Sequence, residues 1–406
     1  MGRYTESLED KWYEICPEDD DYKEKLMEVT KMFRGFDQVL DEFLVNKGYP
    51  GAEGDVDQKA AFVKTCFEKT GIERVPRNLK KYFTENRRFD RTTAFQFCFA
   101  FELDIRETED FFRRVCLQRG IDCHDMQEAV YYYAIRNGLS WTEAQGLIQR
   151  LPEDKKGKVD LSSGDILYTG TVVRALNQIR DEEGLIHFLK ENQRQFGYNN
   201  ATAYQLIMTI WNKIVEKKTG LADREMALFE NGEKDNKKDK KKNTEEKPRS
   251  VWEIYLQILG LGTGIQKALS VSSADRSLKP LLKDSSLLHP LAEENFPDRQ
   301  GLEMITSGKH VSYERVRKML ILLVFYYYWV SLAIKRVDGT YSAKYGDGER
   351  CIDQINRYLA DASYPELYAG NPYDWIFMFA AQDDLPLATF REFMQEICRE
   401  AGIRDM

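Results

Sequence analysis

The sequence predicts an all-α protein, and three observations support that class. Apolar residues recur at three- and four-residue steps through most of the chain, which is the spacing of one helix face. Strand-like alternation is confined to short pieces near residues 158–168 and 337–345. With 406 residues, of which 42% are hydrophobic, the chain is long enough for two or three domains with cores of their own.

The apolar stripes begin near the N-terminus of the chain. Leu26, Val29 and Phe33 lie on one face of an amphipathic helix, and the stripe continues to Leu44. Later stripes predict helices at residues 94–103, 129–137, 142–148, 172–179, 201–215, 251–259, 316–334, 351–359 and 387–397.

Several predicted helices carry signals at their ends. Asp90, Ser140 and Ser312 each precede an apolar stripe and are residue types that cap a helix N-terminus. Gly138 and Gly220 follow helical runs, where a residue in the left-handed conformation ends a helix at little cost. These signals indicate helix boundaries independently of the apolar spacing.

The clearest domain boundary is the segment 233–249, which has eight basic residues, five acidic residues and no apolar residue. Such a segment cannot fold against a core, so it predicts a flexible charged linker, and the alternative is a tether whose lysines contact nucleic-acid phosphates. A second, less distinct domain boundary is predicted at residues 151–164. The predicted organisation is a helical domain at 1–150, a helical extension at 151–232, the linker, and a helical C-terminal domain at 250–406.

Composition excludes several classes of protein. The net charge of −8 excludes a general nucleic-acid coat, although a local basic face remains compatible with it. Seven scattered cysteines without a Cys-x-x-Cys pair argue against a disulfide framework, and the N-terminal residues lack the apolar core of a secretory signal. The apolar run 319–334 is shorter than the roughly 20 residues that span a bilayer. We therefore expect a cytoplasmic protein with no membrane partner.

The segment 57–112 contains a characteristic order of elements. A helix at 60–67 ends near Gly71, a short turn follows, and Pro76 begins a second, basic helix, since proline is tolerated in the first turn. A basic turn then leads to an apolar helix at 91–103, and a further helix begins near Glu107. Helix, tight turn, short basic helix and apolar helix is the order of a helix-turn-helix domain.

This segment resembles the phage-repressor-like (XRE-type) family of helix-turn-helix regulators over about sixty residues. In that family the helix after the tight turn enters the major groove of DNA, and here that helix is the one beginning at Pro76. The resemblance implies a helix-turn-helix-like N-terminal domain, joined by the charged linker to the C-terminal domain, with double-stranded DNA as its partner. The surrounding chain is similar to uncharacterised bacterial helical proteins that carry such a module.

Charge in the same segment is consistent with the resemblance. Residues 74–91 contain seven cations and two anions within an acidic protein. Arg77 and Asn78 are chemically suited to guanine and adenine edges, whereas the later arginines are suited to phosphates. Contact with a protein and a plain solvated face stay open as alternatives. The predicted nucleic-acid-binding residues are Arg74, Arg77, Asn78, Lys80, Lys81, Arg87, Arg88 and Arg91.

The second half of the chain contains a weaker copy of this order at residues 287–335. A short helix, a glycine turn, a cap and a long apolar helix follow one another there, and chance helical patterning explains this equally well. The aromatic C-terminal helices, including 326–329 and 364–379, predict a protein partner or self-association. The cations of a second contact surface would be Arg299, Lys309, His310, Arg315, Arg317 and Lys318.

The search for chemistry finds no cofactor, metal or catalytic motif. The glycines at 260–264 lack the Gly-Lys-Ser/Thr of a phosphate loop, and Cys123 and His124 have no second cysteine or histidine nearby. His124 follows Arg119, and His187 follows Arg180, at a spacing that resembles the helical ribonucleases of the HEPN family, in which arginine and histidine share one helix.

Three functions therefore remain, and we expect no enzyme. The first is DNA binding, in the manner of a transcriptional regulator or a mobile-element accessory protein. The second is a non-enzymatic interaction scaffold, for example in phage defence. The third is a HEPN-like ribonuclease.

Overall fold

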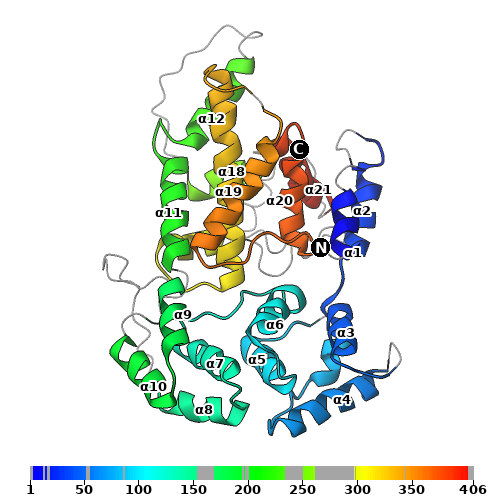
Figure 1. The fold of residues 1–406 in the computed structure, drawn as a ribbon. Coiled ribbons are helices and arrows are strands. Elements are labelled where there is room, and N and C mark those ends of the chain that lie inside the picture. Colours follow the sequence, from blue (N-terminus) through cyan, green and yellow to red (C-terminus); the bar gives the residue numbers. More distant parts are fainter. Residues whose placement is uncertain are drawn as a thin grey trace. The chain divides into compact units, whose positions relative to one another are not determined.

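The structure is a computed structural model, and all regular secondary structure in the part of the chain that it describes is helical (Figure 1). No strand occurs within these residues, which confirms the all-α class. The described residues are 3–11, 14–15, 19–51, 55–85, 87–152, 169–193, 196, 201–233, 250–260, 297, 299–342 and 344–400.

The chain divides into two compact units that do not follow one another simply along the sequence. Unit 1 contains Met1–Phe33, Thr202–Ala362 and Glu366–Met406, and unit 2 contains Arg34–Ala201 and Ser363–Pro365. The first 33 residues therefore belong with the C-terminal half, which the composition of the chain did not indicate.

Unit 2 contains the whole segment that resembles a helix-turn-helix. Its elements are α3 (Phe36–Asn46), α4 (Val56–Lys69), the 3-10 helix η2 (Leu79–Phe83), α5 (Arg91–Ala100), α6 (Ile105–Asp110), the π-helix η3 (Phe111–Val115), α7 (Met126–Arg136), α8 (Trp141–Gln149), α9 (Thr169–Gln178) and α10 (Glu182–Glu191).

The core of unit 2 is built largely from aromatic rings. Phe89 is 2% exposed, and its ring centroid lies 4.8 Å from Phe36, 4.7 Å from Tyr82 and 4.3 Å from Phe97. Burial of rings of this size is a large part of the hydrophobic stabilisation of a domain. Residues on both sides of Phe89 are thereby attached to the core.

Local capping signals predicted two of the helix starts correctly. The carboxylate of Asp90 accepts a hydrogen bond from the Thr93 amide at 2.8 Å, and Ser140 forms a capping box with Glu143 at the start of α8. Gly138 has a φ of +67° after α7, as expected for a helix-ending glycine. Ser312 precedes its helix, but its side chain makes no capping hydrogen bond.

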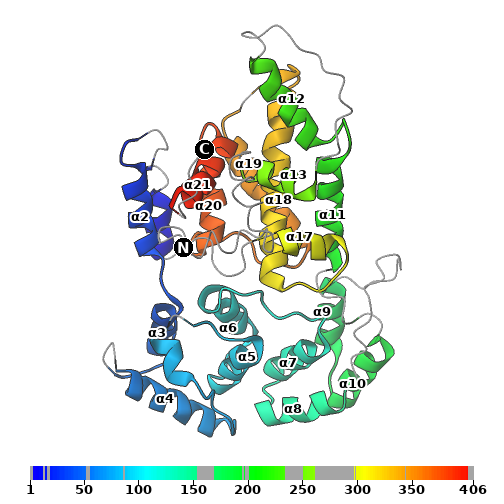
Figure 2. The ribbon, with the colours of Figure 1, turned by 180° about the vertical axis from the view of Figure 1, so that it is seen from behind.

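Unit 1 is organised around one long helix, α18 (Tyr313–Val337), and Figure 2 shows α13 and α17 on one side of it. α18 is long and apolar enough to cross a membrane, and 61% of its most apolar 18-residue window is buried inside the protein. The other elements are α1 (Arg3–Asp10), α2 (Tyr22–Met32), α11 (Ala201–Val215), α12 (Leu221–Glu233), α13 (Val251–Ile258), α17 (Arg299–Thr306), α19 (Asp347–Asp361), α20 (Pro372–Ala381) and α21 (Pro386–Glu400).

The N-terminal helices are held to unit 1 by Trp375 of α20. The indole Nε1–H of Trp375 donates to the carbonyl oxygen of Leu8 at 3.2 Å, and its ring lies 6.1 Å from that of Phe33. Trp375 and Leu8 are both fully buried. A contact between residues 367 positions apart thus decides the membership of the first 33 residues.

Candidate nucleic-acid interface

The predicted DNA-contacting helix differs from the observed structure. α4 ends at Lys69, and Gly71 follows with a φ of +72°, as the sequence indicated. However, the helix predicted to begin at Pro76 is absent, and only the 3-10 helix Leu79–Phe83 forms. The amide of Leu79 donates to the carbonyl of Pro76 at 3.1 Å, a bond over three residues instead of four.

Packing explains why this turn stays short. Leu79, Tyr82 and Phe83 are all buried, so three of the five residues of η2 point into the core. Tyr82 packs on Phe89 beyond the following turn, and the chain must therefore turn back within a few residues. Nine residues separate α4 from η2, whereas a helix-turn-helix uses a turn of three to four. The resemblance to the repressor-like family stays a prediction.

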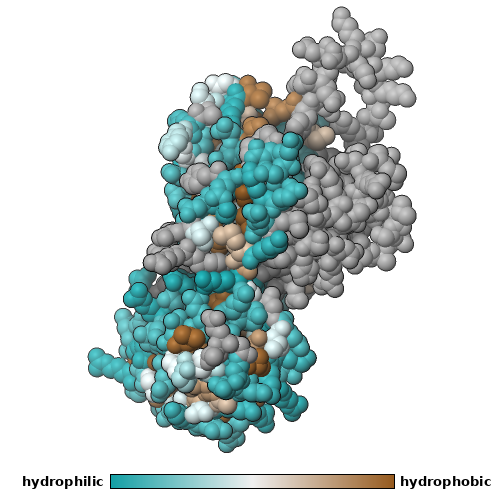
Figure 3. Space-filling model, turned by 90° about the vertical axis from the view of Figure 1, so that its right-hand side faces the viewer, coloured by the Kyte–Doolittle hydropathy of each residue, from teal (hydrophilic) through white to brown (hydrophobic). Residues whose placement is uncertain are grey.

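The predicted cations around η2 lie mostly at the surface. We call the described residues 72–85, 87 and 88 the basic loop. In Figure 3 the face of the protein over α3 and α4, which precede the basic loop in unit 2, is largely hydrophilic. Arg88 is half-buried, and the exposed members of the predicted set are Arg74, Arg77, Asn78, Lys80, Lys81 and Arg87.

Two lysines of the basic loop have carboxylate neighbours. Lys80 Nζ lies 2.5 Å from Asp57 Oδ1, and Lys81 Nζ lies 3.2 Å from Glu85 Oε1. The hydrogen bond from Lys80 lowers the pKa of the Asp57 carboxyl. All four side chains are about half exposed or more, so solvent screens both ion pairs and they are weak. Both lysines therefore remain accessible to a competing anion.

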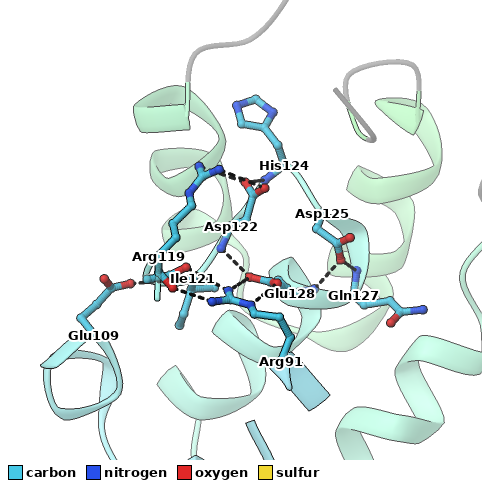
Figure 4. Close-up of polar contacts among 10 residues, drawn as sticks. Arg91, Glu109, Arg119, Ile121, Asp122, His124, Asp125, Gln127 and Glu128 are labelled. Carbon is cyan, nitrogen blue, oxygen red and sulfur yellow. Dashed lines mark hydrogen bonds and ion pairs between the residues drawn. The ribbon is translucent and has the colours of Figure 1, made fainter. Parts of the chain in front are cut away.

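Arg91 does not belong to this surface, and its predicted contact with phosphate is corrected by its geometry. Its Nε donates to Glu128 Oε1 at 3.0 Å, and its Nη2 donates to the carbonyl of Gly120 at 3.0 Å (Figure 4). The guanidinium also lies 4.3 Å from the ring centre of Phe112. Arg91 follows the cap of α5, so its side chain points to α7 and not to solvent.

Arg91 is part of a buried polar network that the sequence did not reveal. Glu128 Oε2 also accepts a hydrogen bond from the Asp122 amide at 2.7 Å, and Glu109 accepts one from the Ile121 amide at 2.9 Å. Burial raises the pKa of Glu128, and the neighbouring Arg91 partly offsets this effect. Buried backbone groups need such partners when no regular structure supplies them.

The network supports an irregular and strained part of unit 2. Residues 116–125 form no helix, yet most of them are buried, and they follow the π-helix η3. Leu117 has a φ of +49°, which is unfavourable for a branched side chain. A Cβ atom at Gly120 would come within 1.8 Å of the Glu109 carboxylate. We found no local sequence signal for this arrangement because its partners come from four separate segments.

The ribonuclease hypothesis required an arginine and a histidine on one helix. Arg119 and His124 both lie in the irregular segment, and Arg119 is 3.3 Å from the carboxylate of Asp122. Figure 4 shows the His124 imidazole pointing away from Glu128. Arg180 precedes α10, which contains His187. Neither pair has the geometry that the resemblance implied.

The second predicted contact surface lies partly outside the described residues. Positions 287–296 and 298 are not described, and neither are positions 234–249 of the predicted linker. Arg317 is buried and forms an ion pair with Asp374 at 2.7 Å, and Lys318 is buried with its ammonium 4.9 Å from the Tyr373 ring. Arg317 and Lys318 are therefore core residues, which corrects their prediction as surface cations.

The aromatic C-terminal helices also contribute mainly to a core. Tyr326, Tyr373 and Trp375 are at most 1% exposed, and Phe377 packs 5.3 Å from Phe325 within unit 1. These rings cannot form a surface for a partner in this conformation. Other apolar side chains of unit 1 are exposed instead, and Val337, Tyr345 and Leu385 are the most exposed among the described residues.

A further polar feature of unit 1 is a cavity of about 240 Å³ at the start of α19. Trp329 and Arg336 of α18 line it, together with Asp347, Gly348 and Ala381. The cavity is smaller than the roughly 300 Å³ typical of sites that enclose a small molecule. Its buried carboxylate is already occupied by neighbours within the protein.

Those neighbours determine the charge state of Asp347. It accepts hydrogen bonds from the Tyr341 hydroxyl, from Arg350 Nη2 at 2.7 Å and from the Lys344 amide at 2.9 Å. Burial opposes the ionisation of Asp347, but these hydrogen bonds outweigh it and lower the pKa to about 2. Asp347 is thus a structural anion at the start of α19.

No protein-family model, curated protein or solved structure matches this chain. Within the described residues, no group of three or more His, Cys, Asp and Glu side chains is placed to hold a metal ion. Among the described residues, the basic loop is the strongest candidate site, because it combines net positive charge with exposure to solvent.

Proposed function

We propose that the protein binds double-stranded DNA through the basic loop, in the role of a transcriptional regulator or a mobile-element accessory protein. The observation that supports the proposal is that most charged side chains of this loop face solvent while most of its apolar side chains face the core. Most of its apolar side chains are buried, whereas Arg77, Lys80, Lys81 and other cations are exposed to solvent. A cluster of exposed cations on an acidic protein is the electrostatic footprint of phosphate binding.

The test measures binding of a labelled duplex of about 20 base pairs. Fluorescence anisotropy reports the affinity at about 50 and about 200 mM salt. The double variant Lys80→Glu/Lys81→Glu should abolish binding. A charge-matched control, Arg106→Glu/Lys190→Glu, changes exposed cations elsewhere in unit 2 and should retain most of the affinity. Absence of duplex binding by the natural sequence at low salt would refute the proposal.

A second function, the interaction scaffold, is favoured by a separate observation in unit 1. Val337 is 68% exposed, Leu385 is 63% exposed, and Tyr345 is fully exposed. Exposed apolar side chains of this size are enriched at protein contacts. If the protein self-associates through them, Tyr345→Ser/Leu385→Ser should lower the sedimentation coefficient measured at high concentration. An unchanged coefficient would remove this support.

A further inference from the structure

We infer that the basic loop is a sequence-independent phosphate-binding surface, whose affinity is limited by competition between DNA phosphates and the carboxylates of Asp57 and Glu85. The inference rests on the proposed function and specifies the kind of DNA contact. Three properties of the loop support it: the burial of its aromatic rings, the shortness of η2, and the two exposed ion pairs.

The loop has no exposed ring with which to contact bases. Tyr82 and Phe83 of the loop are 6% and 7% exposed, and Phe89, which follows the loop, is 2% exposed. The rings of Tyr82 and Phe89 pack against each other, and Tyr82 also packs against Phe36 in the unit 2 core. Stacking on single strands needs an exposed aromatic face, and kinking of a duplex needs an exposed apolar wedge. These buried side chains can make neither contact, so they do not contact the bases of the nucleic acid.

The loop also lacks a helix that could read the major groove. A recognition helix presents side chains to base edges over more than one turn, whereas η2 has five residues and three of them are buried. Its remaining residues are Lys80 and Lys81, whose ammonium groups are flexible point charges suited to phosphates. Arg77 and Asn78 precede η2 in a turn, without a helical frame to hold them at a base pair.

Asp57 and Glu85 place fixed anions beside the two lysines. Asp57 lies in the first turn of α4, and the hydrogen bond from Lys80 lowers the pKa of its carboxyl, so Asp57 is ionised near neutral pH. To bind Lys80 and Lys81, a phosphate must displace the carboxylates of Asp57 and Glu85 or share the two lysines with them. Removal of a carboxylate should therefore free one lysine for a phosphate and also remove a repulsive charge.

The test compares Asp57→Asn, Glu85→Gln and their combination with Glu191→Gln. The control removes one exposed carboxylate from α10, at a position with no lysine partner among the described residues. Each loop variant should bind the duplex roughly two- to five-fold more tightly than the natural sequence. The salt dependence should steepen by about 0.9 in log–log slope for each freed lysine, while the control changes neither quantity.

In competition experiments, the affinities for two duplexes of unrelated sequence should agree within about three-fold, because phosphates carry no sequence information. A preference above about a hundred-fold would overturn the inference, since it requires contacts to bases. Loop variants that behave like Glu191→Gln would also overturn it, and the proposed function would stand if Lys80→Glu/Lys81→Glu still abolished binding. If the natural protein bound no duplex at all, the proposed function itself would fail.

Discussion

Replacement of Glu128 by glutamine should destabilise unit 2 selectively. Glutamine has nearly the same shape, so the packing of α7 is kept while the negative charge facing Arg91 is removed. Arg91 then remains in the interior, held against the rings of Phe95 and Phe112, without its carboxylate partner. The amide of Asp122 also loses a charged acceptor and faces a group that can present a donor instead.

The magnitude follows from the burial of both partners. The side chains of Arg91 and Glu128 are 25% and 11% exposed, so solvent screens the pair only slightly. Removal of one partner from a buried ion pair costs about 3–5 kcal/mol, and the residual exposure of Arg91 favours the lower end of that range. Since a domain is stable by about 5–15 kcal/mol, a loss of about 3 kcal/mol is a large fraction.

Hydrogen exchange followed by mass spectrometry measures this effect separately in each unit. A loss of about 3 kcal/mol corresponds to roughly a hundred-fold faster exchange of the most protected amides in α5 and α7. Peptides from α18 in unit 1 should exchange as before. The double variant Arg91→Met/Glu128→Leu removes both charges and should recover most of the lost protection, because the pair itself contributes little net stability.

The reasoning would be refuted in either of two ways. The first is protection of α5 and α7 in Glu128→Gln equal to that of the natural sequence, which would mean that Arg91 finds water or another acceptor at no cost. Alternatively, the double variant could be less stable than the single one, which would mean that the network stabilises the irregular segment through more than charge compensation.

Two further predictions concern unit 1. Gly348→Ala places a Cβ atom 2.0 Å from the carbonyl oxygen of Ala381, so it should lower the stability of unit 1 by about 1–3 kcal/mol in urea unfolding. The lowered pKa of Asp347, about 2, means that its stabilisation is present above the unfolded-state pKa of about 4 and is lost as the pH falls toward 2. Asp347→Asn should therefore flatten the decline in stability between pH 4 and 2, and an unchanged decline would contradict the assignment.

Several features of the candidate site could be predicted from the sequence because they depend on neighbouring residues. Lys80 and Lys81 are adjacent and lie between Leu79 and the pair Tyr82 and Phe83, and burial of these apolar residues leaves the lysines at the surface. The carboxylate at position 90 caps α5 as predicted, because a cap needs only the next three residues. Exposure of the basic loop was thus implied by its own composition.

Other features depend on residues that are distant in the chain. Arg91 has the same chemistry as its neighbours Arg87, which is exposed, and Arg88, which is half-buried, and its local sequence gave no reason to separate it from them. Its partner Glu128 lies 37 residues away and comes within reach only when α5 and α7 pack together. The helix expected from Pro76 was likewise shortened by the contact of Tyr82 with Phe89.

By itself, the amino-acid sequence determined the helical class, the positions of many helices to within a few residues, and the net positive charge of the basic loop. These properties arise from apolar spacing, capping and local composition, which act over a few residues. Tertiary structure decided which cations stay in solvent, how long η2 becomes, and which unit the first 33 residues join. Those outcomes depend on the free energy of packing between distant segments. The conformational preference of a short stretch of sequence does not contain that free energy.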